Sequence, residues 1–352
     1  MITFYPGPSR LHTQVESYLN DAFHSGLLSM NHRSKPFMEM LEDTMNKMKE
    51  KLFIPASYQI VFTSSATECW EIIAQSLTLG QSYHYFNGAF GEKWCEYAHR
   101  IHGKSIAQPF PLEDQPLMVS VNHHSDDLLC FTHTETSNGA VIADETLSSA
   151  RQNFKGLIAV DATSSMAGTD LPWKDADVWY ASVQKCFGLP SGLGVMILSP
   201  AAVDRAYAIK ENKHYNSLAF VIDNFRKFQT PYTPNILGIY LMNRLMGSVD
   251  PIDKISLHLK NRYLRLLKFL EEFGVSPLIK NPKSRSSTVM AIQDAKDQVS
   301  AIKRFASTKG IVLGNGYGPW KESTFRIANF PAIPDTEFDE LEDCLREFWR
   351  KR

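Results

Sequence analysis

Lys185 stands directly after an apolar segment of the sequence, in the stretch YASVQKCFGLPSG. A glutamine precedes this lysine, and glycine, proline and serine follow it. The simplest interpretation is a solvated lysine at the end of a strand. A lysine in a dry site has another use, because burial lowers its pKa and leaves a neutral amine that acts as a nucleophile or a general base. Polar residues at other strand ends help to decide between a solvated lysine and a reactive one.

Asp161 ends a run that is apolar throughout, LIAV in the stretch LIAVDATSS. Such a run is typical of a strand that is covered on both sides. A carboxylate at the end of a buried strand is costly unless a positive charge pairs with it. The cation of a bound ligand would satisfy Asp161.

Hydroxyls and backbone donors gather where IVFTSS passes into ATECWEIIAQSL, at Ser64, Ser65, Ala66 and Thr67. The free N–H groups at the start of a helix bind phosphate well. An ordinary helix N-cap explains the same residues, so both interpretations stay open at this point.

Two further strand ends offer groups for a flat ligand. CFTHTETSNG carries Thr134, Glu135 and Thr136, whose side chains could orient a ring hydroxyl. YFNGAFGEKW places Phe90 among small residues, where its face could stack on a ring. A core position is the alternative for Phe90, since phenylalanine is among the most buried residue types.

The elements that carry these residues alternate between short β-branched or aromatic runs and helix-like stretches over residues 58–200. This alternation predicts a mostly parallel sheet with helices on both faces, and ligands of such sheets lie at the carboxyl ends of the strands. The expected strands are YQIVFTSS, SYHYFN, LLCFTHTETS, LIAVDATSS, VWYASVQK and GVMILS.

A different pattern begins after residue 250. A long amphipathic helix is expected in DKISLHLKNRYLRLLKFLEEFG, followed by strand-like STVMAI, helical AKDQVSAIKRFASTKG, strand-like TFRIANF and a final helix in DTEFDELEDCLREFWRKR. We predict a large α/β domain over residues 15–245 and a smaller α+β domain over 246–352, which residues 1–14 join.

Composition excludes several other classes of protein. The 37 basic and 38 acidic residues nearly cancel, which argues against nucleic-acid or membrane-surface partners. The five cysteines are scattered without C-x-x-C spacing, which argues against disulfides and a metal site and favours a reducing cytoplasm. The start lacks the pattern of a signal peptide, and apolar runs are too short to span a membrane.

Pyridoxal 5'-phosphate needs the combination of groups that these strand ends offer. Its aldehyde forms a Schiff base with a lysine, its protonated ring nitrogen lies beside a carboxylate, and its phosphate needs backbone donors. We therefore predict that Lys185 holds this cofactor covalently.

The sequence resembles the fold-type I, class V aminotransferases over nearly the whole chain, from YPGPS to FRIANF. The order and spacing of NHRS, HTETSNG, VDATSS and SVQK carry the resemblance. It implies a large domain with a mostly parallel seven-stranded sheet sandwiched by helices and a smaller α+β C-terminal domain. Within the class, the chain is similar to the members that act on phosphoserine.

The resemblance implies roles for the cofactor-binding residues. Lys185 would hold the cofactor, Asp161 would pair with its ring nitrogen and Thr136 would reach its ring hydroxyl. Phe90 would stack on the ring where the family usually has tryptophan, and Gln184 would touch the phosphate.

Three further residues would bind the cofactor phosphate. Ala66 and Thr67 would donate from one subunit, and Thr233 in PYTPN would reach over from the other. A homodimer with the active site at the subunit interface is implied.

The substrate-binding residues are implied in the same way. Arg326 in STFRIANF would clamp the α-carboxylate, since its planar fork meets a carboxylate bidentately, and Ser9 would help. His32 and Arg33 would meet the phosphate of the substrate. The expected reaction is reversible transamination between O-phospho-L-serine and 2-oxoglutarate, in serine biosynthesis.

Alternatives remain open. Thr67 stands where the phosphoserine-specific members carry an arginine, so a serine or alanine–glyoxylate type of aminotransferase is the second hypothesis. Arg33 could instead cap a helix or form an ion pair on the surface, and His32 could be a hydrogen-bonded histidine with only a structural role. A desulfurase would need a cysteine in a mobile loop, whereas Cys186 should point away from the cofactor. GNGYG lacks the G-x-G-x-x-G spacing of a dinucleotide-binding oxidoreductase.

Overall fold

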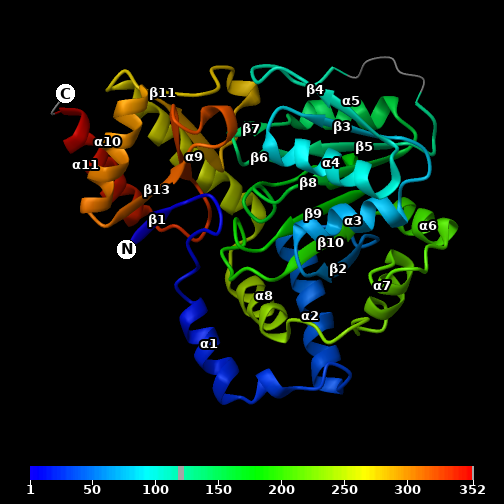
Figure 1. Ribbon diagram of the computed structural model, residues 1–352. Helices are drawn as coiled ribbons and strands as arrows, with labels where there is room; N and C mark the ends of the chain where they lie inside the picture. Colours follow the sequence, from blue (N-terminus) through cyan, green and yellow to red (C-terminus); the bar gives the residue numbers. More distant parts are fainter. Residues whose placement is uncertain (118–122, 351–352) are drawn as a thin grey trace.

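Two sheets organise the chain in the computed structural model, which describes residues 1–117 and 123–350 (Figure 1). The larger sheet has seven strands in the order β2-β10-β9-β8-β5-β3-β4, and the smaller has five in the order β1-β13-β14-β12-β11. The predicted α/β architecture with a seven-stranded sheet is confirmed.

The large sheet is parallel except for one strand. β10 runs antiparallel to both its neighbours, β9 and β2, whereas all other neighbouring pairs are parallel. Its strands are β2 (Gln59–Thr63), β3 (Ser82–Phe86), β4 (Ser105–Pro109), β5 (Leu128–Thr132), β8 (Leu157–Asp161), β9 (Val178–Ser182) and β10 (Gly194–Leu198).

The central strands are buried along their whole length, as their continuous apolar runs predict. Register brings their carboxyl ends together: Asp161 of β8 lies opposite Thr132 of β5 and Tyr180 of β9. The polar residues that follow these strands therefore share one edge of the sheet.

Helices cover the large sheet, with α3 and α4 lying in front of it in Figure 1. The perpendicular packing of Trp94 from α4 on Tyr180 from β9, with ring centres 5.2 Å apart, fixes this layer to the sheet. The helices before the small domain are α1 (Val15–His24), α2 (Lys35–Leu52), α3 (Ala66–Ser76), α4 (Ala89–His102), α5 (Asp144–Asn153), α6 (Pro200–Ile209), α7 (Leu218–Phe225) and α8 (Ile236–Ser248).

The small sheet joins the two ends of the chain, because β1 pairs in parallel with β13. The domain boundaries at residues 15 and 246 stay a prediction. The sheet contains β1 (Ile2–Phe4), β11 (Ser276–Pro277), β12 (Val289–Gln293), β13 (Ile311–Asn315) and β14 (Thr324–Ala328). Three helices accompany it, α9 (Ile252–Glu271), α10 (Lys296–Thr308) and α11 (Asp335–Arg350).

Sequence patterns did not single out every strand. β1, β4, β11 and β13 were not expected, nor was the two-residue hairpin of β6 (Thr134–Glu135) and β7 (Ala140–Val141). The GNGYG segment begins inside β13 rather than at a strand-to-helix turn. In the ranges that the structure describes, none of the helices has both the length and the apolar character to cross a bilayer.

Candidate active site

Lys185 lies in the turn after β9 and is almost fully buried, with 8% of its surface exposed. Its Nζ donates hydrogen bonds to Oγ1 of Thr136 at 2.7 Å and to Oγ of Ser164 at 3.1 Å. Burial lowers the pKa of this lysine, while the negative charges of Asp161 and Glu135 act in the opposite direction. Such an amine gives up its proton more readily than a solvated lysine does.

A cavity of about 330 Å³ opens beside Lys185. Its volume falls within the range that small-molecule sites occupy. The sequence-predicted residues that line it are Ala66, Thr67, Phe90, Thr136, Asp161, Gln184 and Lys185. The structure thus brings together all of the predicted cofactor contacts except Thr233.

Asp161 is the last residue of β8 and has 5% of its surface exposed. Its Oδ1 accepts a hydrogen bond from the backbone N–H of Thr163 at 2.9 Å. Burial raises the pKa of Asp161, which the charge of Lys185 opposes. A cationic group placed in the cavity would stabilise the ionised carboxylate.

The start of α3 forms one wall of the cavity. Ala66 donates its N–H to Oγ of Ser182 at 2.7 Å, and Thr67 is exposed. The preceding serines do not join this wall: the N–H and hydroxyl of Ser64 both bind Glu68, and the hydroxyl of Ser65 caps the helix. The N-cap interpretation is confirmed for Ser65, whereas phosphate binding by Ala66 and Thr67 stays a prediction.

Phe90 is half-buried and lines the cavity from the first turn of α4, and its ring centre lies 5.1 Å from Nζ of Lys185. Glu135 fixes this turn, because its Oε2 accepts the N–H groups of Phe90 at 3.1 Å and of Gly91 at 3.2 Å. The expectation that Glu135 orients a ring hydroxyl is therefore wrong. Gly88 permits this approach, since a Cβ there would lie 2.3 Å from Cγ of Glu135.

Arg326 reaches the neighbourhood of Lys185 from the small sheet. It lies on β14, is buried, and donates from Nη1 to the backbone oxygen of Thr136 at 2.6 Å and from Nε to that of Asn315 at 2.6 Å. A guanidinium has five N–H donors, so three remain for a ligand. Arg326 does not itself line the cavity beside Lys185.

The N-terminal segment passes over Lys185. Gly7 lines the cavity, and a Cβ at this residue would lie 3.0 Å from Cε of Lys185. Ser9 donates its backbone N–H to the oxygen of Gln184 at 3.0 Å, and its own buried hydroxyl has no partner among the described residues.

His32, Arg33 and Thr233 are not brought into this cavity within one subunit. The segment before α2 lies at the lower end of the molecule in Figure 1, away from the small domain. Arg33 is exposed and donates to Oε1 of Gln229 at 3.0 Å, and Thr233 is exposed.

Sequence reasoning missed several residues of the site. Ser164 binds Lys185 directly, and Lys93, Trp70 and Tyr97 line the cavity from α3 and α4. The spacing of Lys93, three residues after Phe90, is a signal that could have found it, because residues three apart share one face of a helix.

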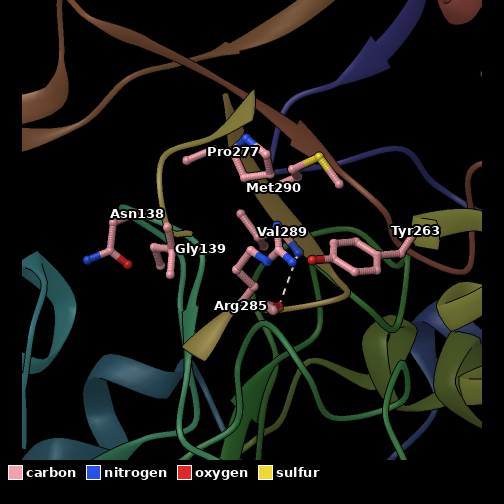
Figure 2. A pocket seen from close by; sticks show the side chains of 10 residues that line it. Asn138, Gly139, Tyr263, Pro277, Arg285, Val289 and Met290 are labelled. Carbon is pink, nitrogen blue, oxygen red and sulfur yellow. Dashed lines mark hydrogen bonds between the residues drawn. The ribbon is translucent and has the colours of Figure 1, made fainter. Parts of the chain in front are cut away.

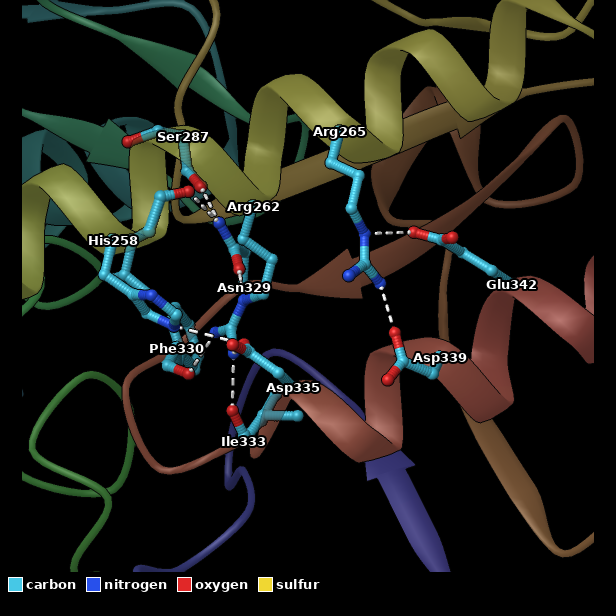
Figure 3. Close-up of polar contacts among 11 residues, drawn as sticks. His258, Arg262, Arg265, Ser287, Asn329, Phe330, Ile333, Asp335, Asp339 and Glu342 are labelled. Atoms are coloured by element: carbon cyan, nitrogen blue, oxygen red, sulfur yellow. Dashed lines mark hydrogen bonds and ion pairs between the residues drawn. The ribbon is translucent and has the colours of Figure 1, made fainter.

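A network around Arg262 holds the segment that follows β14 (Figure 3). Arg262, on α9, donates to Oδ1 of Asn329 at 2.7 Å and to the backbone oxygens of Ile333 at 2.6 Å and Phe330 at 2.9 Å. It also pairs with Asp335 at 3.0 Å. The network anchors the strand that carries Arg326.

A second cavity, among Asn138, Gly139, Tyr263, Arg285 and Met290, has a volume of only about 10 Å³ (Figure 2). This is space for about one water molecule. Nε of Arg285 is buried there without a hydrogen-bond partner in the described part of the chain. The cavity suits a bridging water and is too small for a substrate.

Comparison with known proteins identifies the family. The model of the family described as aminotransferase class-V matches residues 112–319, which is more than half of the chain. The chain belongs to the class V aminotransferases, which are enzymes that depend on pyridoxal phosphate.

Individual relatives are more specific. A phosphoserine aminotransferase from Rhodococcus opacus is 28% identical, over 95% of this chain and 91% of its own. The crystal structure of a phosphoserine aminotransferase from Cytophaga hutchinsonii is 30% identical, covers 98% of both chains and superposes with a TM-score of 0.93. An aspartate aminotransferase from Thermus thermophilus shares the fold at 22% identity, with a TM-score of 0.85 over 100% of this chain and 99% of its own.

The residues present fit the cofactor of this family. The cavity offers an amine in Lys185, a buried carboxylate in Asp161, an aromatic face in Phe90 and the start of a helix at Ala66. The buried hydroxyl of Thr132 also lines the cavity and has no partner among the described residues. A ligand with a cationic ring, an aldehyde and a phosphate uses each of these groups.

Proposed function

We propose that this enzyme transfers the amino group of O-phospho-L-serine to 2-oxoglutarate, giving 3-phosphohydroxypyruvate and glutamate, as a reversible step of serine biosynthesis. The observation that carries the proposal is the likeness, over nearly the whole length of the chain, to proteins named phosphoserine aminotransferase. The buried Lys185 and Asp161 in one cavity support the chemistry.

Lys185 is proposed as the catalytic residue. Pyridoxal phosphate supplies an electron sink for the α-carbon when bound. With the cofactor in place, Nζ of Lys185 would take the proton from the α-carbon of the bound substrate. The lowered pKa of Lys185 favours this role, because a neutral amine is needed to accept the proton. Thr136 and Ser164 orient Nζ toward the cavity.

The other cofactor contacts are proposed in line with the family, and the positions of these residues in the cavity, Thr233 excepted, support them. Asp161 would keep the ring nitrogen protonated, Phe90 would stack on the ring and Thr136 would bind the ring hydroxyl. Ala66, Thr67 and Gln184 would bind the phosphate, and Thr233 of the partner subunit would complete that site.

Arg326 and Ser9 are proposed to bind the α-carboxylate of the substrate. His32 and Arg33 are proposed to bind its phosphate. Because both lie away from the cavity of their own subunit, they would serve the site of the partner in a homodimer. We also propose that the enzyme works in the cytoplasm, since all five cysteines are buried and free.

A serine or alanine–glyoxylate aminotransferase is the second candidate. Thr67 favours it, because a threonine supplies no charge for a substrate phosphate. The holoenzyme should be assayed with phosphoserine, serine and alanine as donors and with 2-oxoglutarate and glyoxylate as acceptors. Phosphoserine should exceed the other donors in kcat/KM by about a hundredfold or more, equivalent to about 2.7 kcal/mol. Equal or better use of serine or alanine would instead support the second candidate.

A further inference from the structure

A second lysine, Lys93, lines the same cavity as Lys185. It lies on α4, and its Nζ is 5.8 Å from the centre of the Phe90 ring, while Nζ of Lys185 is 5.1 Å from the same centre. Glu135 holds the first turn of this helix through the N–H groups of Phe90 and Gly91. The position of Lys93 relative to the reacting lysine is therefore set by the fold.

Lys93 has a hydroxyl as its partner rather than a carboxylate. Its Nζ donates to the OH of Tyr317 at 2.9 Å and lies 5.4 Å from the centre of that ring. This hydrogen bond raises the pKa of Lys93, so the side chain is charged at neutral pH. The acid that follows one turn later, Glu96, pairs with Arg100 at 3.8 Å. Among the residues that the structure describes, none forms an ion pair with Lys93, and a charged amine that borders a cavity in this way favours an anion there.

Tyr317 also contacts Arg326. The guanidinium carbon of Arg326 lies 5.6 Å from the centre of the Tyr317 ring, so two cations flank a single tyrosine. One comes from the small sheet and the other from α4 of the large domain. Both cations thus lie beside the same ring, and the cavity that Lys93 lines also contains Lys185.

We infer that Lys93 binds the distal anion, a phosphate or a carboxylate, of the doubly anionic substrates and thereby sets the preference of the enzyme for them. The inference rests on the proposed function in one respect, that Arg326 takes the α-carboxylate. Thr67 on α3 stands where phosphoserine-specific members carry an arginine, and it has no charge. Lys93 would supply a positive charge from α4 instead.

Unreactive acids test this inference by calorimetry on the holoenzyme. 3-Phosphonopropionate and glutarate carry a distal anion, whereas propionate and butyrate lack it. Lys93→Met should weaken the binding of the first pair by about tenfold or more, the size expected for a lost charge-assisted hydrogen bond. Binding of the second pair should change less than about twofold, because neither acid has a group that reaches Lys93.

Two control variants separate charge from folding. Lys93→Arg keeps the charge and should therefore keep the wild-type difference in affinity between the acids with a distal anion and those without it. Lys104→Met removes an exposed positive charge just beyond the end of the same helix, leaves the pair of Glu96 with Arg100 in place, and should leave all four affinities unchanged. The visible absorption of the bound cofactor in Lys93→Met checks that the site is intact.

Each outcome bears on the inference. If Lys93→Met loses affinity for the phosphonate alone, or for glutarate alone, the result supports Lys93 as the distal-anion residue and shows which anion it selects. If Lys93→Met keeps its affinity for both of these acids, or loses affinity equally for all four acids, the inference is overturned. The titrations need no turnover of phosphoserine, so a wild-type enzyme that prefers alanine as donor would refute the proposed function, while the binding of a distal anion by Lys93 would still be measured on its own.

Discussion

Nζ of Lys185 lies 2.7 Å from Oγ1 of Thr136, and the backbone oxygen of the same threonine accepts a hydrogen bond from Nη1 of Arg326 at 2.6 Å. One residue thus connects the proposed catalytic lysine of the large domain to the proposed carboxylate clamp of the small sheet. Its two contacts fix the separation between the amine proposed to take the α-proton and the group proposed to hold the α-carboxylate.

Replacement of Asp161 by asparagine tests the role of its charge. Asp161→Asn keeps an acceptor for the N–H of Thr163 but cannot hold a protonated ring nitrogen. We expect the rate of the half-reaction with the amino donor to fall by about a hundredfold or more in stopped-flow measurements, as for other preorganised electrostatic groups. Asp161→Glu, which keeps the charge, should retain more activity. A rate for Asp161→Asn within threefold of wild type would contradict the assignment, because about 0.7 kcal/mol is too little for this role.

Mixed dimers test whether the site is shared between subunits. Lys185→Ala and Arg33→Ala are each expected to have little activity with phosphoserine. Mixing and re-equilibrating equal amounts should restore up to about one quarter of wild-type activity, since half of the dimers are hybrids and each hybrid has one intact site. Mixtures that stay inactive although hybrids form would show that Arg33 serves its own subunit or none.

His84 predicts a pH dependence of stability. It is buried on β3, and burial lowers its pKa from 6.5 to about 3. Because the folded state binds this proton less readily than the unfolded state, the contribution of His84 is fully present above pH 6.5 and is lost as the pH falls toward 3. As the pH falls from 6.5 to about 4.5, the loss of this contribution should lower the free energy of unfolding by about 2 to 3 kcal/mol.

Urea unfolding of His84→Gln measures this contribution. The variant should show a shallower loss of stability over the same pH range than wild type. His99→Gln, which alters an exposed histidine on α4, should leave the wild-type slope unchanged. Equal slopes for His84→Gln and wild type would contradict the prediction.

Two arginines of α9 form a matched pair (Figure 3). Arg262→Met should lower the free energy of unfolding by about 3 kcal/mol, because it removes a buried cation with several hydrogen bonds. Arg265 is half exposed and pairs with Asp339 and Glu342, so Arg265→Met should cost less than about 1 kcal/mol. Arg262→Met should also raise KM for carboxylate substrates, since Arg262 anchors the end of β14. Equal losses for both variants would refute the special role of Arg262.

The positions of Lys185 and Asp161 could be predicted because each follows a short apolar run. Such runs form buried parallel strands, and these strands end at a common edge of the sheet. Lys93 could not be found by the same rule, because it lies one turn inside a helix and its role depends on Tyr317, which follows in the chain by more than two hundred residues.

Other parts of the fold depend on contacts that local patterns do not encode. β13 has a glycine near its end, and β4 ends in a proline, which weakens the signal of both strands. The strand-end position of Glu135 is visible in the sequence and predicts a contact of its carboxylate with the ligand. Its true partner, the start of α4, is set by tertiary packing.

The attachment of the cofactor to Lys185 tests the central claim most directly. The holoenzyme should be reduced with borohydride and digested, and the peptides analysed by mass spectrometry. We predict that the visible absorption is bleached and that the peptide containing Lys185 gains the mass of one reduced pyridoxal phosphate. A label on Lys93 instead, or no label on any lysine of a protein saturated with the cofactor, would contradict this account of the site.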